Sequence, residues 1–317
     1  MAYHHPSMSG ESEGTDVGGL RHHAFLYDDD DEFVERSAAF LLAGLQAGEA
    51  AIVAAPPGRL ALMREALGAD AARARFIDAA ALYQRPARTI AAFYGTLLEH
   101  LCRAPSVRAV ADVPFGPTRQ ERDRWTAYEA ITNRAYAHLP AWVVCAYATS
   151  ELPDQVVEIA WRTHPEVLAK DRQPSPRYED QTALLRSLTP QPRQLNHLRL
   201  VAAGNDQQTL RENLASELSA EGIAPKQALD LLVAANEIAT NAYQHADGVA
   251  VLRVGRAGGR LVCEITDRGK GFDDPLAGYI PPKPEQQTGQ GLWIVRQLVS
   301  RLEFLFTPDG HTTRLWL

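Results

Sequence analysis

The most informative segment of this chain is Ala235-Asn-Glu-Ile-Ala-Thr-Asn-Ala-Tyr-Gln-His245. It belongs to a pattern of helical spacing that begins with a proline, so we expect one helix from Pro225 to about Ala246. Glu237 and Asn241 are four residues apart and therefore share one face of that helix, which His245 extends by a further turn. Such a polar stripe is unusual on a helix whose other face is apolar, at Leu229, Leu232, Val233 and Ala239.

These polar side chains have the chemistry of a metal-dependent phosphate site. The amide oxygen of Asn241 is a hard ligand that suits Mg²⁺, an ion that keeps most of its waters and binds phosphates. Glu237, one turn away, could hold a coordinated water or accept a proton from an attacking hydroxyl. Taken alone, the same pattern also fits a polar helix face that is exposed to solvent.

Two glycine-containing segments follow this helix. The first is Asp267-Arg-Gly269-Lys-Gly271, directly after an expected strand, where a carboxylate can accept a hydrogen bond from an exocyclic amine and glycines let the backbone approach a ligand. The second is Gly289-Gln-Gly291-Leu292, which opens an expected helix and leaves amide donors free to hold phosphate. Each segment is weak evidence by itself, because ordinary turns use the same residues.

Taken together, in this order and at this spacing, the three segments resemble the Bergerat fold of the GHKL ATPases (gyrase, Hsp90, histidine kinases and MutL). The resemblance covers residues 195–317 and implies a C-terminal α+β sandwich that binds ATP and Mg²⁺. It implies that Asp267 contacts the adenine amino group and that Asn241 holds Mg²⁺. A family threonine near the adenine corresponds to Thr312, with Thr313 as the alternative. The remaining nucleotide contacts would come from His245, Gly269, Gly271, Gly289, Gly291 and Leu292.

Among GHKL proteins, this compact domain most resembles the anti-sigma-factor serine kinases of the RsbW type. Members of that family bind a sigma factor, phosphorylate a serine on a STAS-domain anti-anti-sigma partner, and commonly form homodimers. The resemblance implies that Glu237 is the general base and that Asp273 to Gln287 form the ATP lid. Four prolines would stiffen that lid: Pro275, Pro281, Pro282 and Pro284.

We therefore expect a bacterial signalling regulator that acts on a sigma factor or a STAS partner. Two rival hypotheses stay open. The first is a switch in which ATP controls partner binding without phosphoryl transfer. The second is an atypical histidine kinase, for which only His197 precedes the domain and no long paired helices are expected.

The preceding part of the chain alternates short apolar runs with helical patterns. Runs such as Ala50–Ala55 and Val107–Val113 suit buried parallel strands, so the alternation predicts an open parallel α/β sheet covered on both faces. Residues 1–20, rich in Ser, Gly, His and acidic residues, are expected to be a disordered tail. A proline-rich linker, 171–194, would then separate a first domain, 21–170, from the second, 195–317.

The first domain resembles the MEDS domain, a sensory module named after a methanogen/methylotroph regulator, whose members look like RecA-type sheets. The matching pieces include Phe25-Leu-Tyr27, Tyr128-Glu129-Ala130 and Thr163-His164-Pro165. Five residues are candidates for sensing an unknown small molecule: His23, Glu129, Cys145, Tyr147 and His164. They fall at expected strand ends or helix starts, where open α/β sheets bind ligands. Each also fits an ordinary core, cap or surface residue, and their spacing gives no support for a metal site.

The composition limits the remaining choices. The chain has 317 residues, 45% of them hydrophobic and 22% charged, as in a soluble protein of about two domains. Its net charge is -7 and its pI about 5.8, so neither direct DNA binding nor attachment to an anionic membrane is expected. Its three cysteines are too dispersed for a disulfide framework, and no apolar run reaches the roughly 20 residues of a membrane span. We expect a cytoplasmic protein.

Overall fold

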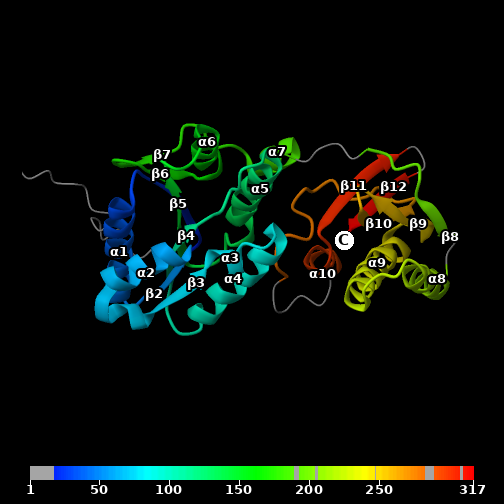
Figure 1. Ribbon diagram of the computed structural model, residues 1–317, viewed down its shortest axis with the longest axis horizontal. Coiled ribbons are helices and arrows are strands. Elements are labelled where there is room, and N and C mark those ends of the chain that lie inside the picture. The colour runs from blue at the N-terminus through cyan, green and yellow to red at the C-terminus, as the bar shows by residue number, and fades with distance from the viewer. Residues whose placement is uncertain (1–17, 189–192, 204–205, 247, 283–288, 308–309) are drawn as a thin grey trace, which may run out of the picture. The chain divides into compact units, whose positions relative to one another are not determined.

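The computed structural model describes residues 18–188, 193–203, 206–246, 248–282, 289–307 and 310–317. The expected tail over residues 1–20 therefore lies almost wholly outside the described residues. The chain forms two compact units, one up to Leu188 and one from Thr189 onward, and Figure 1 shows the elements of each. Among the described helices, none has the length and apolar character needed to cross a membrane.

The first unit is built on a seven-stranded sheet, which confirms the expected open and mostly parallel architecture. Every neighbouring pair is parallel except the last, in which the edge strand runs antiparallel. In spatial order the strands are β3 (Ala74–Asp78), β2 (Ala50–Ala55), β4 (Val107–Asp112), β5 (Ala141–Ala148), β1 (Arg21–Tyr27), β6 (Glu166–Leu168) and β7 (Arg172–Pro174).

Helices cover both faces of this sheet because the strand side chains alternate. Val144 and Ala146 of β5 pack into the apolar cluster formed with the first two helices, whereas Cys145 and Tyr147 point toward α5 on the other face. The helices are α1 (Asp30–Gln46), α2 (Pro57–Leu67), α3 (Ala79–Leu82), α4 (Pro86–Leu101), α5 (Arg119–Ala135), α6 (Asp154–Thr163) and α7 (Gln181–Leu188), with a short 3₁₀ turn at Gly68–Arg73.

Local capping explains where two of these helices begin. The acidic run Asp28 to Glu32 suggests a helix that starts at Phe33. However, the carboxylate of Asp29 accepts a hydrogen bond from the amide of Glu32 at 2.9 Å, so α1 begins three residues earlier, at Asp30. Thr118 and Glu121 form a reciprocal capping box, which starts α5 at Arg119.

The end of the first unit differs from the linker expected over residues 171–194. β7 pairs with β6, and α7 buries Leu184 and Leu185 within the first unit, which extends to Leu188. Residues 172–174 and 181–188 therefore belong to the sheet domain, although the prolines of this stretch are typical of a linker.

The second unit is a five-stranded antiparallel sheet, with helices packed on one face (Figure 1). In spatial order the strands are β11 (Arg301–Thr307), β12 (Gly310–Trp316), β10 (Arg260–Asp267), β9 (Val249–Ala257) and β8 (Arg199–Ala203). The helices are α8 (Gln207–Ala220), α9 (Pro225–His245) and α10 (Gly291–Leu298). This arrangement confirms the expected α+β sandwich.

Two details of this unit correct the expectations. Leu229 and Val233 on α9 are exposed, and the buried face is formed instead by Leu231, Ala234, Ala235, Ile238 and Ala242. The sequence pattern suggests a last helix over Leu292–Leu302. The observed helix ends at Leu298, because Arg301 already pairs with Trp316 in the terminal hairpin.

Candidate functional site

A cavity of about 670 Å³ opens beside α9 in the second unit. Three segments that are far apart in the sequence line it. α9 contributes Asn241 and His245, the end of β10 and the loop after it contribute Asp267, Gly269 and Gly271, and β12 contributes Thr313. The fold therefore brings two of the three sequence segments to one hollow.

Asp267 lies buried at the end of β10, where its carboxylate faces this cavity. One carboxylate oxygen, Oδ1, accepts a hydrogen bond from the Gly269 amide at 2.7 Å. The other, Oδ2, lies 3.5 Å from Nδ1 of His311. Among the described residues, Oδ1 therefore makes a hydrogen bond, whereas Oδ2 has only this longer contact.

His311 is a site residue that the sequence analysis missed. Its ring is buried beside the cavity and packs against Phe272 and Phe304, with ring centroids 5.8 and 5.6 Å away. Neither ring nitrogen makes a hydrogen bond within the described part of the chain, and the same holds for the hydroxyl of Thr313. Buried polar atoms almost always have partners, so these three atoms are candidates for contacts with a polar ligand.

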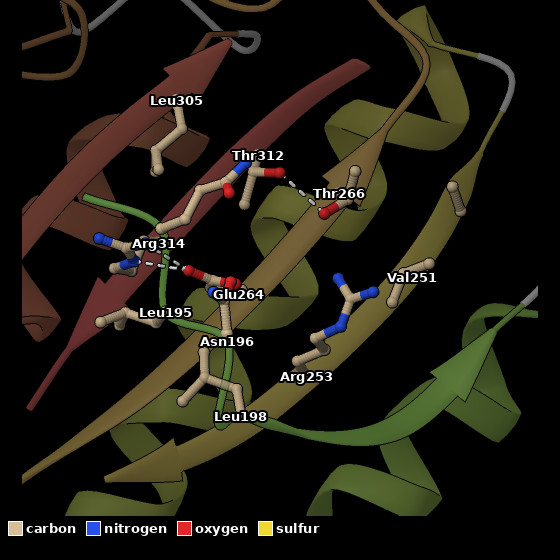
Figure 2. A pocket seen from close by; sticks show the side chains of 12 residues that line it. Leu195, Asn196, Leu198, Val251, Arg253, Glu264, Thr266, Leu305, Thr312 and Arg314 are labelled. Atoms are coloured by element: carbon tan, nitrogen blue, oxygen red, sulfur yellow. Dashed lines mark hydrogen bonds and ion pairs between the residues drawn. The ribbon is translucent and has the colours of Figure 1, made fainter. Parts of the chain in front are cut away.

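The two threonines on β12 face opposite sides of the sheet. Thr312 donates to or accepts from the hydroxyl of Thr266 at 2.8 Å, on the face that also carries Glu264 and Arg314 (Figure 2). Thr313 faces α9 and lines the cavity. Strand alternation therefore places the alternative, Thr313, at this cavity, whereas Thr312 faces the other side of the sheet.

Gly271 is required by close packing. Its φ is +68°, and a Cβ at this position would overlap the ring of His311. Gly269 is similarly crowded, because its Cβ would lie 2.6 Å from Cβ of Ala246. The glycines after β10 thus let this loop approach both α9 and β12.

The third sequence segment meets α9 beyond the cavity lining. A Cβ on Gly291, the first residue of α10, would lie 2.9 Å from Oε2 of Glu237 and 3.8 Å from Oδ1 of Asn241. The start of α10 and the polar face of α9 are therefore in contact. Leu292 is buried in the apolar core, whereas Gly289 is exposed with a φ of +82°.

Only part of the expected lid can be located. Residues 283–288 lie outside the described part, and the preceding residues are anchored by α10. Buried Arg296 donates from Nε to the carbonyl of Ala277 at 2.7 Å and stacks over the ring of Tyr279 at 3.7 Å. Burial lowers the pKa of this guanidinium, so the two contacts compensate for its removal from water.

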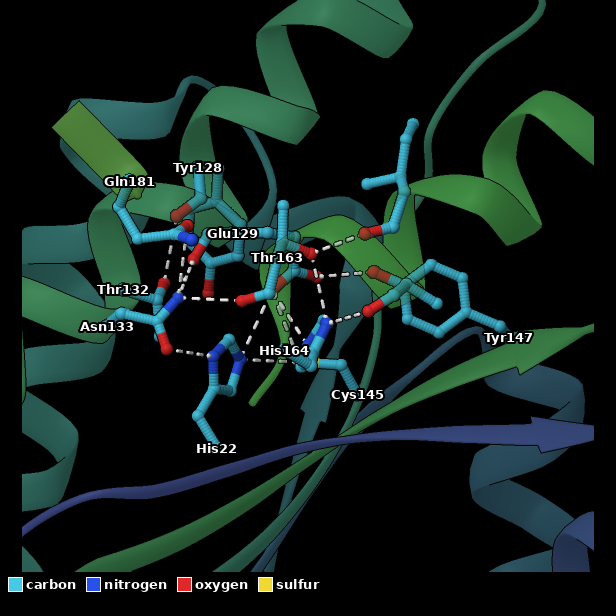
Figure 3. A network of polar contacts seen from close by, with 12 residues as sticks. His22, Tyr128, Glu129, Thr132, Asn133, Cys145, Tyr147, Thr163, His164 and Gln181 are labelled. Atoms are coloured by element: carbon cyan, nitrogen blue, oxygen red, sulfur yellow. Dashed lines mark hydrogen bonds and ion pairs between the residues drawn. The ribbon is translucent and has the colours of Figure 1, made fainter. Parts of the chain in front are cut away.

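The sensory candidates separate into two groups. Glu129, Cys145, Tyr147 and His164 come together in a buried network between the sheet and α5, where His22 joins them (Figure 3). His23 does not, because it follows His22 along β1 and points to the opposite face, toward Trp142 and Glu166. The network is inside the core instead of in an open hollow at the strand ends.

The second unit thus has the fold and the site of a nucleotide-binding domain in which an antiparallel sheet carries helices on one face. Residues 200–317 match the family model of the histidine kinase-like ATPase domain. Residues 21–165 match the MEDS family, described as the methanogen/methylotroph, DcmR sensory domain. The chain therefore consists of a MEDS domain followed by a histidine kinase-like ATPase domain. No curated protein matches it.

Proposed function

We propose that this protein is a cytoplasmic signalling regulator in which the MEDS domain controls an ATP-dependent anti-sigma-type protein serine kinase. One observation carries the proposal. The carboxylate of Glu237, the amide of Asn241 and the backbone of Gly291 lie at one place, where α9 meets the start of α10. This arrangement unites a base, a metal ligand and backbone amide donors, which are the parts that phosphoryl transfer needs.

The residues around the cavity fit a magnesium nucleotide. Asp267 offers a carboxylate oxygen to the exocyclic amine of adenine, and the unpartnered Thr313 and His311 can complete contacts to the ring. Asn241 lies on the same helix face as Glu237 and offers an oxygen of the kind that Mg²⁺ prefers. The bound ion would neutralise phosphate charge.

In the proposed reaction, Glu237 accepts the proton of a serine hydroxyl on the partner. The serine oxygen forms a bond to the terminal phosphorus as the bond from that phosphorus to the bridging oxygen breaks. ADP leaves with the released electron pair, and the amides at the start of α10 stabilise its charge. The acceptor serine belongs to a STAS-domain partner. The ATPase domain of this chain also binds a sigma factor, and it forms a homodimer.

Glu237→Gln tests this assignment, because glutamine keeps the shape of the side chain and removes its basicity. The full-length protein is incubated with labelled ATP and the STAS proteins encoded by its own organism, and ATP affinity is measured in parallel. We expect unchanged ATP binding and transfer to serine reduced about 100-fold or more, the usual contribution of a general base. Glu212→Gln removes the same charge at an exposed position on α8. It should leave both ATP binding and transfer to serine unchanged.

Other outcomes separate the rival functions. Tight ATP binding by the wild-type protein with transfer to no STAS protein would contradict the kinase and leave a switch that only binds its partner. Transfer to histidine would instead indicate a histidine kinase.

A further inference from the structure

Four potential metal ligands converge in the MEDS domain: His22 of β1, Glu129 of α5, Cys145 of β5 and His164 at the end of α6. Each is at most 2% exposed. Their ligand atoms all lie within 4.8 Å of one another (Figure 3). Four side chains from four elements thus surround one point in the core.

Four of the six distances between these atoms match the edges of a coordination tetrahedron, and the other two are at most 4.8 Å. Nε2 of His22 lies 3.3 Å from Oε2 of Glu129 and 3.3 Å from Sγ of Cys145. Oε2 of Glu129 lies 3.5 Å from that Sγ and 3.6 Å from Nε2 of His164. Zinc bonds to nitrogen, oxygen and sulfur of about 2.0–2.3 Å give tetrahedral edges of about 3.3–3.8 Å.

Outer contacts orient both imidazole rings toward this point. Asn133 donates from Nδ2 to the Thr163 carbonyl at 2.8 Å, so its Oδ1 is left to accept from Nδ1 of His22 at 3.1 Å. Nδ1 of His164 lies 3.0 Å from the Ala160 carbonyl, which can only accept. Both rings therefore carry their proton on Nδ1 and direct the lone pair of Nε2 inward, as in histidines that bind a metal through Nε2.

A purely polar network explains this arrangement less well. Nε2 of His164 is fully buried and has no hydrogen-bond partner among the described residues. It faces Glu129 and the ring of His22, which is only 4.1 Å away between centroids. A buried lone pair aimed at a carboxylate oxygen is unfavourable unless something positive lies between them.

We propose that His22, Glu129, Cys145 and His164 form a closed site for a divalent transition-metal ion, best suited to Zn²⁺. A thiolate and a carboxylate would balance the two positive charges of the ion, so the buried site would be neutral. Imidazole and thiolate ligands favour zinc over Mg²⁺ and Ca²⁺, which prefer oxygen. Binding forms a bond from zinc to Sγ of Cys145 and releases the thiol proton to solvent.

The sequence could not indicate this site. Its ligands are spread over more than 140 positions, from 22 to 164, without the short spacings of familiar zinc motifs. His22 and His23 are adjacent, and only the phase of β1 determines which of them faces α5. The site also shares no residue with the nucleotide cavity, because all four ligands lie in the first unit.

The wild-type protein tests the proposal directly. Full-length protein is stripped with a strong chelator without nucleotide, and is then titrated with Co²⁺ and, separately, Zn²⁺. We expect about one ion per chain, with a cobalt–thiolate charge-transfer absorption that Zn²⁺ abolishes by displacement. Because the tail also carries His4 and His5, the thiolate absorption, and not total metal, is the deciding signal. A folded protein that never shows this absorption would overturn the proposal.

Variants then assign the ligands. Cys145→Ser should lose the thiolate absorption, and His164→Gln should weaken zinc affinity at least about 10-fold, the lower end of the effect of disturbing even outer contacts. The matched controls are Cys263→Ser, a buried cysteine of the second unit, and His23→Gln, the neighbour of His22. Both should keep the wild-type absorption. If Cys263→Ser loses the absorption, or if Cys145→Ser keeps it, the site is not the one proposed.

Discussion

At the residue scale, a shift of one position along β12 decides which threonine faces the cavity, as Thr312 and Thr313 show. Thr313 has an unpartnered hydroxyl in the cavity, whereas Thr312 is paired with Thr266 on the other face of the sheet. Thr313→Val should therefore lower ATP affinity about 3- to 10-fold, the effect of losing one hydrogen bond of roughly 1 kcal/mol. Thr312→Val should leave the affinity unchanged.

Isothermal calorimetry on both variants checks this prediction, with the thermal unfolding temperature recorded to confirm that each is folded. Normal ATP affinity in Thr313→Val, together with weakened affinity in Thr312→Val, would show that the other face of the sheet holds the nucleotide.

At the element scale, the alternation of side chains along β1 places the neighbouring His22 and His23 on opposite faces of the sheet. Nε1 of Trp142 can only donate, and it lies 3.1 Å from Nδ1 of His23, so this nitrogen carries no proton. Nε2 of His23 can then donate to Glu166 at 3.0 Å while the ring stays neutral. Burial lowers the pKa of His23 to about 3, despite the opposing effect of Glu166.

The sign of the resulting pH dependence follows from these two states. The pKa of His23 is about 6.5 when unfolded and about 3 when folded, so only the unfolded chain binds this proton between those values. The stabilisation is fully present above pH 6.5 and is lost as the pH falls toward 3. This loss is at most about 1.4 kcal/mol per pH unit.

His23→Gln should remove this contribution to the slope. Calorimetric unfolding of the first unit from pH 7 toward pH 4 measures it, with wild type and variant compared in the same buffers. Parallel pH profiles for the two proteins would contradict the neutral, buried state of His23.

Most elements were predictable because periodicity and capping are local. Ala50–Ala55 was predicted with its observed bounds, and the helix carrying Glu237 and Asn241 ends within one residue of the prediction. Segments with fewer local signals were missed or misplaced. Residues 172–174 resemble a linker in composition, and they become a strand only because β6 offers an edge for pairing.

Those residues of the candidate site that belong to a local sequence motif were predictable. Those that reach the site only through tertiary packing were not. Asp267, Gly269 and Gly271 lie together at the cavity because one turn holds them. His311 belongs to no motif and reaches the site through the pairing of β12 with β10, opposite Asp267. The choice between Thr312 and Thr313 likewise depends on a register that sequence spacing does not fix.

At the scale of the whole molecule, the second unit should fold alone if its first residues are retained. Residues 193–198 lie across the sheet, where the Arg193 carbonyl accepts a hydrogen bond from Nη2 of buried Arg314 at 2.8 Å. A fragment over residues 189–317 should therefore fold and bind ATP. A fragment over 198–317 should lose about 1–3 kcal/mol of unfolding free energy, because the buried guanidinium of Arg314 loses this hydrogen-bond partner.

Denaturant unfolding and ATP titration of both fragments measure this difference. Equal stability would mean that residues 193–197 are dispensable. Failure of the longer fragment to fold would mean that the second unit needs the MEDS domain.

In the proposed ATP site of the second unit, Asp267 accepts a hydrogen bond from the amino group of adenine. Guanine presents a carbonyl where adenine presents an amine, so a buried carboxylate would face another acceptor. ATP should bind at least about 10-fold more tightly than GTP, a difference of about 1.4 kcal/mol. Asp267→Asn can still accept from the Gly269 amide but turns a donor toward the base, so the preference should vanish or reverse.

Calorimetric titration of full-length wild type, Asp267→Asn and the control Asp230→Asn with both nucleotides in excess Mg²⁺ is therefore the most direct test. Asp230 lies on α9 and pairs with Lys226 outside the cavity lining, so its variant should keep the wild-type preference. We expect a preference for ATP over GTP in the wild type and in Asp230→Asn, and no such preference in Asp267→Asn. Equal affinities of the wild type for ATP and GTP, or an unchanged preference in Asp267→Asn, would contradict this expectation.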